Sequence, residues 1–183
     1  MRICALDLSK RSAGFACWAP GDARVASGAW VLGSEFTPRG RVFAKLHENL
    51  SDLHSLGAID ALFYEQPLNL GPAAGNTNAD TISVLIGLAM HAESWGEALS
   101  CRIIRAVNMA TWRRDFLGRM PRATKTAQLK DLAIERCRQL GFRTAKHDEA
   151  EAIGILDHAC TSLDIMPFWR AEEVLRPALG RAG

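Results

Sequence analysis

The sequence predicts a mixed α/β fold in which helices flank a five-stranded sheet. Two observations predict it. Three short apolar segments separated by polar turns open the chain, and strand-like segments then alternate with segments of helical periodicity. The short connections favour an antiparallel meander, and the later strand–helix–strand–helix–strand section implies parallel pairing through right-handed crossovers. At 183 residues the chain suits one full core, so we expect a single domain over residues 1–183.

Each expected element follows from its local pattern. We expect strands at 2–8, 13–19, 24–32, 59–64 and 101–107. We expect helices at 42–56, 80–98, 108–117, 123–140 and 147–163. The first helix rests on apolar residues at helical spacing, namely Val42, Leu46, Leu50, Leu53 and Leu56. Asn108 is a candidate N-cap of the third. The residues after 166 carry no usable pattern.

Composition and local hydropathy exclude several classes of protein. With 48% hydrophobic and 23% charged residues, the chain has the composition of a globular protein. Its longest largely apolar run, 82–90, is far shorter than the roughly 20 residues of a membrane span. The first residues lack a secretory pattern, and the five cysteines form no CxxC pair. We therefore expect a cytoplasmic protein with free thiols and no membrane segment.

Positive charge is concentrated in one part of the chain. The net charge is only +2, but residues 102–146 hold twelve Lys or Arg against three acids. Such a segment is typical of a phosphate-binding surface, and a solvated helical face is the alternative. The turn beside Asp7 adds two cations near the expected site. The candidate DNA-binding residues are Lys10, Arg11, Arg113, Arg114, Arg119, Arg122 and Lys125.

Acidic residues stand at comparable places in three segments. Asp7 ends the first expected strand, and Glu65 ends the fourth. Asp148 and Glu151 open the last long helix three residues apart, so they share a face, whereas Glu149 is rotated about 100° away. If the first and fourth strands are neighbours and this helix crosses them, four carboxylates converge. Taken singly, each acid could instead be a turn cap, a strand-end ion pair or an ordinary first-turn acid.

Converging carboxylates predict a metal centre. Four of them cannot all stay ionised in a partly dry cleft without cations. Oxygen ligands of this type suit Mg²⁺, with Mn²⁺ as a substitute. Two such ions about 3.5–4 Å apart would activate a water and stabilise the leaving oxygen in phosphodiester hydrolysis.

Five segments in this order resemble the RuvC family of Holliday junction resolvases, especially its phage-type relatives. They are ALDLSKRSAG, ALFYEQP, WRRDFLG, LKDLAIERCRQLG and HDEAEAIGI. The resemblance covers residues 2–159. It implies a ribonuclease H-like fold and Mg²⁺-dependent cutting of branched or four-way-junction DNA by a homodimer.

The resemblance also implies roles for individual residues. It assigns the catalytic metal ligands to Asp7, Glu65, Asp148 and Glu151, and it brings Lys130 to the scissile phosphate. The chain departs from the family in two places. The last acid is Glu151 where the family has Asp, and the loop after Glu65 offers Leu68 and Leu70 but no aromatic wedge.

Two other functions are compatible with parts of the pattern. A non-catalytic DNA-binding protein on the same scaffold would keep the basic segment without the chemistry. An actin-like or sugar-kinase-like ATPase also begins with an aspartate-containing hairpin, but it requires a second glycine-rich phosphate hairpin that the sequence lacks. No GxxxxGK[ST] or GxGxxG motif is present either.

Overall fold

An antiparallel meander begins the chain, and parallel strands extend it into a five-stranded sheet. The computed structural model describes residues 1–67, 79–121 and 124–171. The strands are β1 (Ile3–Leu8), β2 (Ser12–Trp18), β3 (Ala26–Val31), β4 (Ala61–Glu65) and β5 (Ile103–Val107). Their order is β3-β2-β1-β4-β5, with β1 antiparallel to β2 and parallel to β4. The predicted mixed sheet is confirmed, and β1 lies at its centre.

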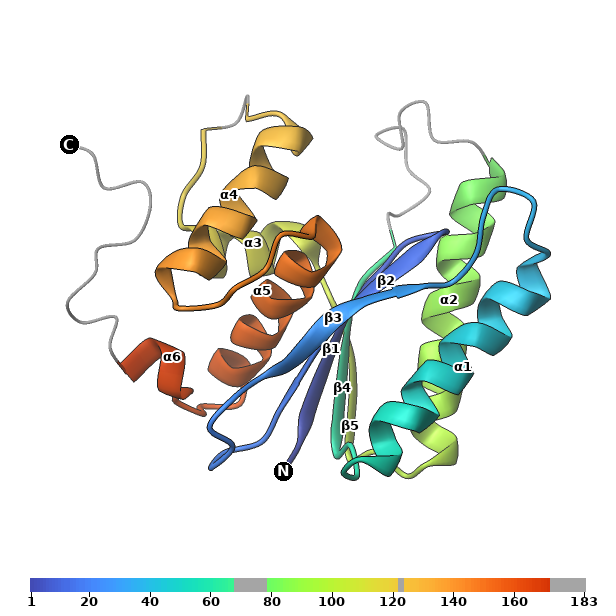
Figure 1. The fold of residues 1–183 in the computed structure, drawn as a ribbon, viewed down its shortest axis with the longest axis horizontal. Coiled ribbons are helices and arrows are strands. Elements are labelled where there is room, and N and C mark those ends of the chain that lie inside the picture. The colour runs from blue at the N-terminus through green and yellow to red at the C-terminus, as the bar shows by residue number, and fades with distance from the viewer. Residues whose placement is uncertain (68–78, 122–123, 172–183) are drawn as a thin grey trace.

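Helices cover both faces of this sheet (Figure 1). In the described residues they are α1 (Arg39–Ser55), α2 (Ala79–Ala98), α3 (Met109–Leu117), α4 (Thr126–Gln139), α5 (His147–Ser162) and α6 (Phe168–Ala171). Helices α1 and α2 lie on one face, and α3, α4 and α5 lie on the other. Each face buries its own hydrophobic cluster, so the sheet separates two cores.

The helical periodicity predicted for α1 is confirmed at four of its five positions. Val42, Leu46, Leu50 and Leu53 are buried, but Leu56 is 81% exposed. The helix ends at Ser55, so Leu56 falls on the C-cap and no longer follows the apolar face. Boundaries elsewhere agree with the predicted ones or differ by at most three residues, which is usual where helix ends and strand ends fray.

Helix α5 packs closely against β1, β2 and α3, and small residues lie at these contacts. Ala150, Ala152 and Gly154 lie on this buried helix, and the rings of Trp112 and Phe116 fill the space beside Gly154. On the sheet side, a Cβ atom at Gly14 would lie 1.9 Å from the carbonyl oxygen of Asp148. Only glycine therefore permits this approach of β2 to the first turn of α5.

Side-chain hydrogen bonds fix the start of α3 and the position of α6 in this helical layer. The Asn108 side chain accepts a hydrogen bond from the Ala110 amide at 2.9 Å, which confirms it as the N-cap of α3. Asp157, buried on α5, accepts hydrogen bonds from Trp169 Nε1 (2.9 Å) and Arg170 Nε (2.8 Å). These bonds fix α6, a helix that the sequence pattern did not predict.

Within residues 1–67, 79–121 and 124–171, no helix is both long enough and apolar enough to span a membrane.

Candidate active site

Three carboxylates from two elements meet at the end of the central strand. Asp7 lies near the end of β1, opposite Gly14 of β2, and Asp148 and Glu151 lie in the first turns of α5. One oxygen from each of the three lies within 4.8 Å of the others. The spacing of three residues puts Asp148 and Glu151 on the same helical face, and the close contact of α5 with β2 brings that face to Asp7. We call these three residues the acidic cluster.

Asp7 carries the least compensated charge of the cluster. Burial raises the pKa of its carboxyl group well above the usual range, the negative charges of Glu151, Glu65 and Asp148 raise it further, and the charge of Lys130 opposes this shift only in part. Among the residues that the structure describes, none gives this carboxylate a hydrogen bond or an ion pair. An ionised Asp7 therefore needs a cation beside it.

Glu65 lies beside the cluster at the end of β4. Its Oε2 accepts a hydrogen bond from Trp112 Nε1 at 2.8 Å. Burial raises the pKa of Glu65, although the Trp112 hydrogen bond and the charge of Arg113 oppose this shift. Glu65 is not one of the three residues whose oxygens share the 4.8 Å group, but its charge acts on Asp7. The structure thus brings all four predicted acids to one region and groups three of them tightly.

Two basic side chains contact Glu151 from outside the cluster. Arg113 Nη2 lies 2.5 Å from Glu151 Oε1, and Lys130 Nζ lies 3.3 Å from Oε2. Burial would lower the pKa of Lys130, but Glu151, together with Asp7 and Asp148, raises it, so the amine stays charged. Lys130, predicted from the family resemblance alone, therefore lies at the site.

Arg113, one of the expected DNA-binding residues, lies inward at the acidic cluster and not on an open surface. Its side chain is only 12% exposed, it pairs with the buried Glu151, and its guanidinium carbon lies 5.2 Å from the centre of the Trp112 ring. Its Nε has no hydrogen-bond partner in the described parts of the chain. The ion pair with Glu151, 38 residues away in the sequence, holds this side chain at the site, which a count of charges along the sequence cannot reveal.

Hydroxyl groups orient the remaining acids of the first turn of α5. Ser12 Oγ donates a hydrogen bond to Asp148, a contact that sequence reasoning missed. Glu149 instead accepts hydrogen bonds from Ser27 Oγ at 2.8 Å and from Thr144 Oγ1 at 2.7 Å. Glu149 thus points away from the cluster, as the helical rotation predicts.

The other predicted DNA-binding residues lie in different environments. Lys10 is paired with Asp80 at 2.6 Å, and Arg11 with Glu35 at 3.1 Å. Arg114, on α3, is exposed and lies 3.3 Å from its neighbour Asp115. The remaining candidates are Arg119 and Lys125, which are exposed with no ion pair to any described residue, and Arg122, which lies outside the described residues. Leu68 and Leu70, in the loop where the sequence offers no aromatic wedge, lie outside the described residues too.

The residues present fit a divalent cation with oxygen ligands. The acidic cluster offers three carboxylates within reach of one ion, and Glu65 offers a fourth nearby. Such ligands suit Mg²⁺ or Mn²⁺ rather than metals that prefer sulfur or imidazole. The buried Asp7 carboxylate, which has no hydrogen bond or ion pair to any described residue, is the observation that most directly favours a cation here.

The sheet order and the placement of the helices define a ribonuclease H-like α/β fold. Two solved structures of RuvC from Thermus thermophilus share it. One, in complex with a Holliday junction substrate, matches with a TM-score of 0.64 and 12% identity over 90% of this chain and 96% of that chain. The other matches with a TM-score of 0.61 and 14% identity over 90% and 97%. No family model matches the chain, and no curated protein matches its sequence. At these identities the likeness concerns the fold.

Proposed function

We propose that this protein is a metal-dependent endonuclease that hydrolyses phosphodiester bonds in branched DNA, including four-way junctions. The observation that carries the proposal is the acidic cluster, in which the buried Asp7 has a raised pKa and no described partner. The fold of the protein, which it shares with a RuvC structure that holds a Holliday junction substrate, supports branched DNA as the substrate class. Neither observation depends on the other.

The chain's own residues would divide the chemistry as follows. Asp7, Glu65, Asp148 and Glu151 would hold the metal, which we propose to be two Mg²⁺ ions with Mn²⁺ as a substitute. When bound, these ions would supply an activated water and neutralise charge on the scissile phosphate. Lys130, charged and partly exposed beside Glu151, would contact that phosphate and stabilise negative charge in the transition state.

Arg113 has a different role in this proposal. Its side chain is almost buried and bonded to Glu151 Oε1, so it orients that carboxylate toward Asp7 and Asp148. Because Glu151 is one methylene longer than aspartate, it has more rotamers to restrict. Arg113 and Lys130 together hold both of its oxygens.

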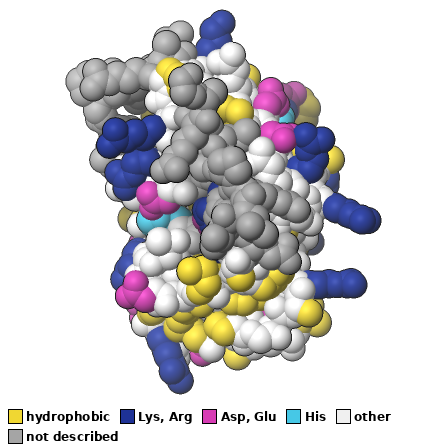
Figure 2. Space-filling model, turned by 90° about the vertical axis from the view of Figure 1, so that its left-hand side faces the viewer, with side chains coloured by type: hydrophobic (Ala, Val, Ile, Leu, Met, Phe, Trp, Pro, Cys, Tyr) yellow, Lys and Arg dark blue, Asp and Glu magenta, His cyan; other side chains and the backbone are white. Residues whose placement is uncertain are grey.

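We propose that DNA phosphates contact the exposed cations beyond the site. Arg114 lies on α3, Arg119 follows the end of α3, and Lys125 immediately precedes α4. Figure 2 shows Lys and Arg side chains projecting around the face that carries α4 and α6. Lys10 and Arg11 would join them only by exchanging their present partners, Asp80 and Glu35. Each phosphate contact should steepen the salt dependence of DNA binding.

We further propose a cytoplasmic homodimer that uses the outer surface of α2. This helix buries one face against the sheet, and Met90 on it is 63% exposed. A dimer would present two acidic clusters to a junction with two-fold symmetry.

A cleavage assay with matched variants tests the proposed function. A labelled four-way junction and a linear duplex of the same sequence are incubated with protein in Mg²⁺ or in EDTA. Metal stabilisation is worth several kcal/mol, and about 1.4 kcal/mol is a factor of ten, so Asp7→Asn and Glu65→Gln should each lower Mg²⁺-dependent cleavage by ~100-fold or more. Both variants should still bind the junction. Asp52→Asn, on the exposed face of α1, is the control and should cut normally.

The same assay separates the alternatives. Junction binding without cleavage by the unmodified protein, with either metal, would favour a non-catalytic DNA-binding protein. ATP hydrolysis without DNA would favour an actin-like or sugar-kinase-like ATPase. Full activity of Asp7→Asn would contradict the proposed role of the acidic cluster.

A further inference from the structure

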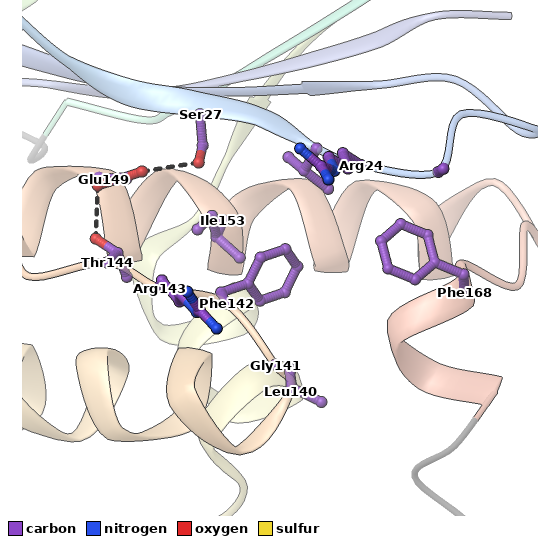
Figure 3. Close-up of a pocket in the computed structure, with 12 residues that line it drawn as sticks. Arg24, Ser27, Leu140, Gly141, Phe142, Arg143, Thr144, Glu149, Ile153 and Phe168 are labelled. Atoms are coloured by element: carbon purple, nitrogen blue, oxygen red, sulfur yellow. Dashed lines mark hydrogen bonds between the residues drawn. The ribbon is translucent and has the colours of Figure 1, made fainter.

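A concave site lies beside Glu149, on the side of the first turn of α5 that faces away from the acidic cluster. It is a pocket of about 540 Å³ between the start of β3, residues 140–144, α5 and α6 (Figure 3). This volume falls within the roughly 300–1,000 Å³ of small-ligand sites. The residues that give the pocket its chemistry are Arg24, Ser27, Phe142, Arg143, Glu149 and Phe168. We call it the β3–α5 pocket.

Aromatic rings form one part of the β3–α5 pocket. Phe142 and Phe168 both line it, and each packs edge-on against the buried Trp169, with centroids 5.5 and 5.1 Å apart. Trp169 is fixed in turn by its hydrogen bond to Asp157. Phe168 remains 44% exposed, although its ring belongs to this aromatic group. A rigid aromatic surface that stays partly open to solvent suits a flat ligand.

Arginine side chains form a second part. Arg24 and Arg143 come from distant parts of the sequence, yet both line the same pocket (Figure 3). Both are exposed, and in the described ranges neither has an ion pair or a side-chain hydrogen bond. Unpaired guanidinium groups at the rim of an aromatic pocket favour a ligand that carries phosphate.

Glu149 supplies fixed hydrogen-bond acceptors at a third position. Ser27 and Thr144 each donate to one of its oxygens, which sets the orientation of the carboxylate in the pocket (Figure 3). Each oxygen keeps a lone pair for a further donor. The pocket thus combines an aromatic surface, cations at the rim and an oriented acceptor. A nucleotide has the complementary groups: a flat base, a phosphate, and N–H donors on the base edge.

We propose that the β3–α5 pocket binds one unpaired nucleotide. The base lies against Phe168 and Phe142, its N–H groups donate to Glu149, and its phosphate is held by Arg24 and Arg143. This inference rests on the proposed nuclease function for its source of ligand. Because Glu149 adjoins Asp148 in α5, a DNA strand that leaves the acidic cluster is within a short distance of the pocket. The enzyme would then favour branched DNA that carries an unpaired nucleotide near the cut.

Fluorescence of 2-aminopurine tests the proposal without cleavage. The probe is placed at a single unpaired position beside a junction, and binding is measured in EDTA with the full chain and with Asp7→Asn. We expect both proteins to quench the probe, and Phe168→Ser to weaken binding of this DNA by about 5- to 150-fold, the range for loss of one stacked base. Arg143→Ala should weaken it as well. Phe36→Ser, which alters a phenylalanine that is 86% exposed elsewhere, should have no effect.

Competing ligands identify the source of the nucleotide and the part of it that binds. Unlabelled deoxyguanosine monophosphate should relieve quenching more effectively than inorganic phosphate or the nucleoside alone. Equal competition by inorganic phosphate would reduce the pocket to an anion site and overturn the proposal. Tight binding of the free mononucleotide with no preference for unpaired DNA would overturn the assignment to a DNA strand.

Comparison with the cleavage assay keeps the two proposals separate. Quenching without cleavage would contradict the nuclease function and leave the pocket intact. Cleavage with equal quenching by Phe168→Ser, Phe36→Ser and the unmodified protein would overturn the pocket alone.

Discussion

Replacing Gly14 with alanine tests whether the contact between β2 and α5 sets the geometry of the acidic cluster. The added Cβ would lie 1.9 Å from the Asp148 carbonyl oxygen, whereas real Cβ atoms essentially never come closer than 3.0 Å to another heavy atom. The obstacle is backbone, which cannot rotate away as a side chain can. The first turn of α5 must therefore move by about 1 Å relative to β1 and β2, the difference between these distances.

This displacement has two measurable consequences. Forcing an extra methyl group into a packed contact costs about 1–3 kcal/mol, which corresponds to a fall in Tm of about 2–12 °C for a chain of this size. Asp148 and Glu151 would also move away from Asp7, and a misplacement of about 1 Å at a catalytic site can lower activity by about 100-fold. We expect metal-dependent cleavage to fall further than stability alone explains.

Thermal unfolding and cleavage of a labelled junction, measured well below the lowered Tm, check both effects. Gly40→Ala is the matched control, because no heavy atom lies within 4 Å of its added Cβ in the first turn of α1. That variant should keep its activity and gain up to about 1 kcal/mol of stability. A Gly14→Ala protein with unchanged Tm and cleavage would refute the role assigned to the contact.

Three further predictions concern charges at the site. Because the pKa of Asp7 is raised in the folded protein, ionisation of Asp7 destabilises the metal-free fold as the pH rises above the usual carboxyl range. In EDTA at about pH 8, Asp7→Asn should therefore have a higher Tm than the unmodified protein. At about pH 3 the two proteins should have the same Tm. Lys130→Met should lower cleavage by about 100-fold while Lys45→Met, on α1, does not. Arg113→Ala should lower the free energy of unfolding, measured with urea, by about 1.5–3 kcal/mol, because the buried Glu151 then has Lys130 as its one remaining ion-pair partner among the described residues.

Each of these has a clear contrary result. Equal melting of Asp7→Asn and the unmodified protein at the higher pH would show that Asp7 is not under electrostatic strain. A Lys130→Met enzyme as active as Lys45→Met would remove Lys130 from the chemistry. Unchanged urea unfolding of Arg113→Ala would mean that the pair with Glu151 contributes no net stability.

The sequence predicted the sheet and most helices because their signals are local. Apolar periodicity located the buried face of α1, and breaks in the apolar pattern located the ends of β1 and β4, which carry Asp7 and Glu65. Helical spacing then separated Asp148 and Glu151 from Glu149. These inferences use neighbours within a few residues, where propensity and periodicity determine structure.

Contacts between segments that are distant in the sequence could not be predicted from local patterns. Ser12 and Asp148 are 136 residues apart, and Arg113 and Glu151 are 38 apart, so no spacing rule relates them. The direction of Arg113 depends on where the adjacent Trp112 is buried. The β3–α5 pocket likewise depends on Arg24 and Arg143 lining one cavity although they are far apart in sequence, which follows from the fold and not from either local pattern.

The indole ring of Trp112 contacts both the hydrophobic core and the charged residues of the candidate active site. The indole lies against Gly154 of α5, donates to Glu65, and stacks beneath the guanidinium of Arg113. Its emission should therefore respond when a divalent ion changes the charge around that carboxylate. With the other four tryptophans replaced by phenylalanine, the chain would carry its own optical reporter of ion loading, readable before any DNA is added.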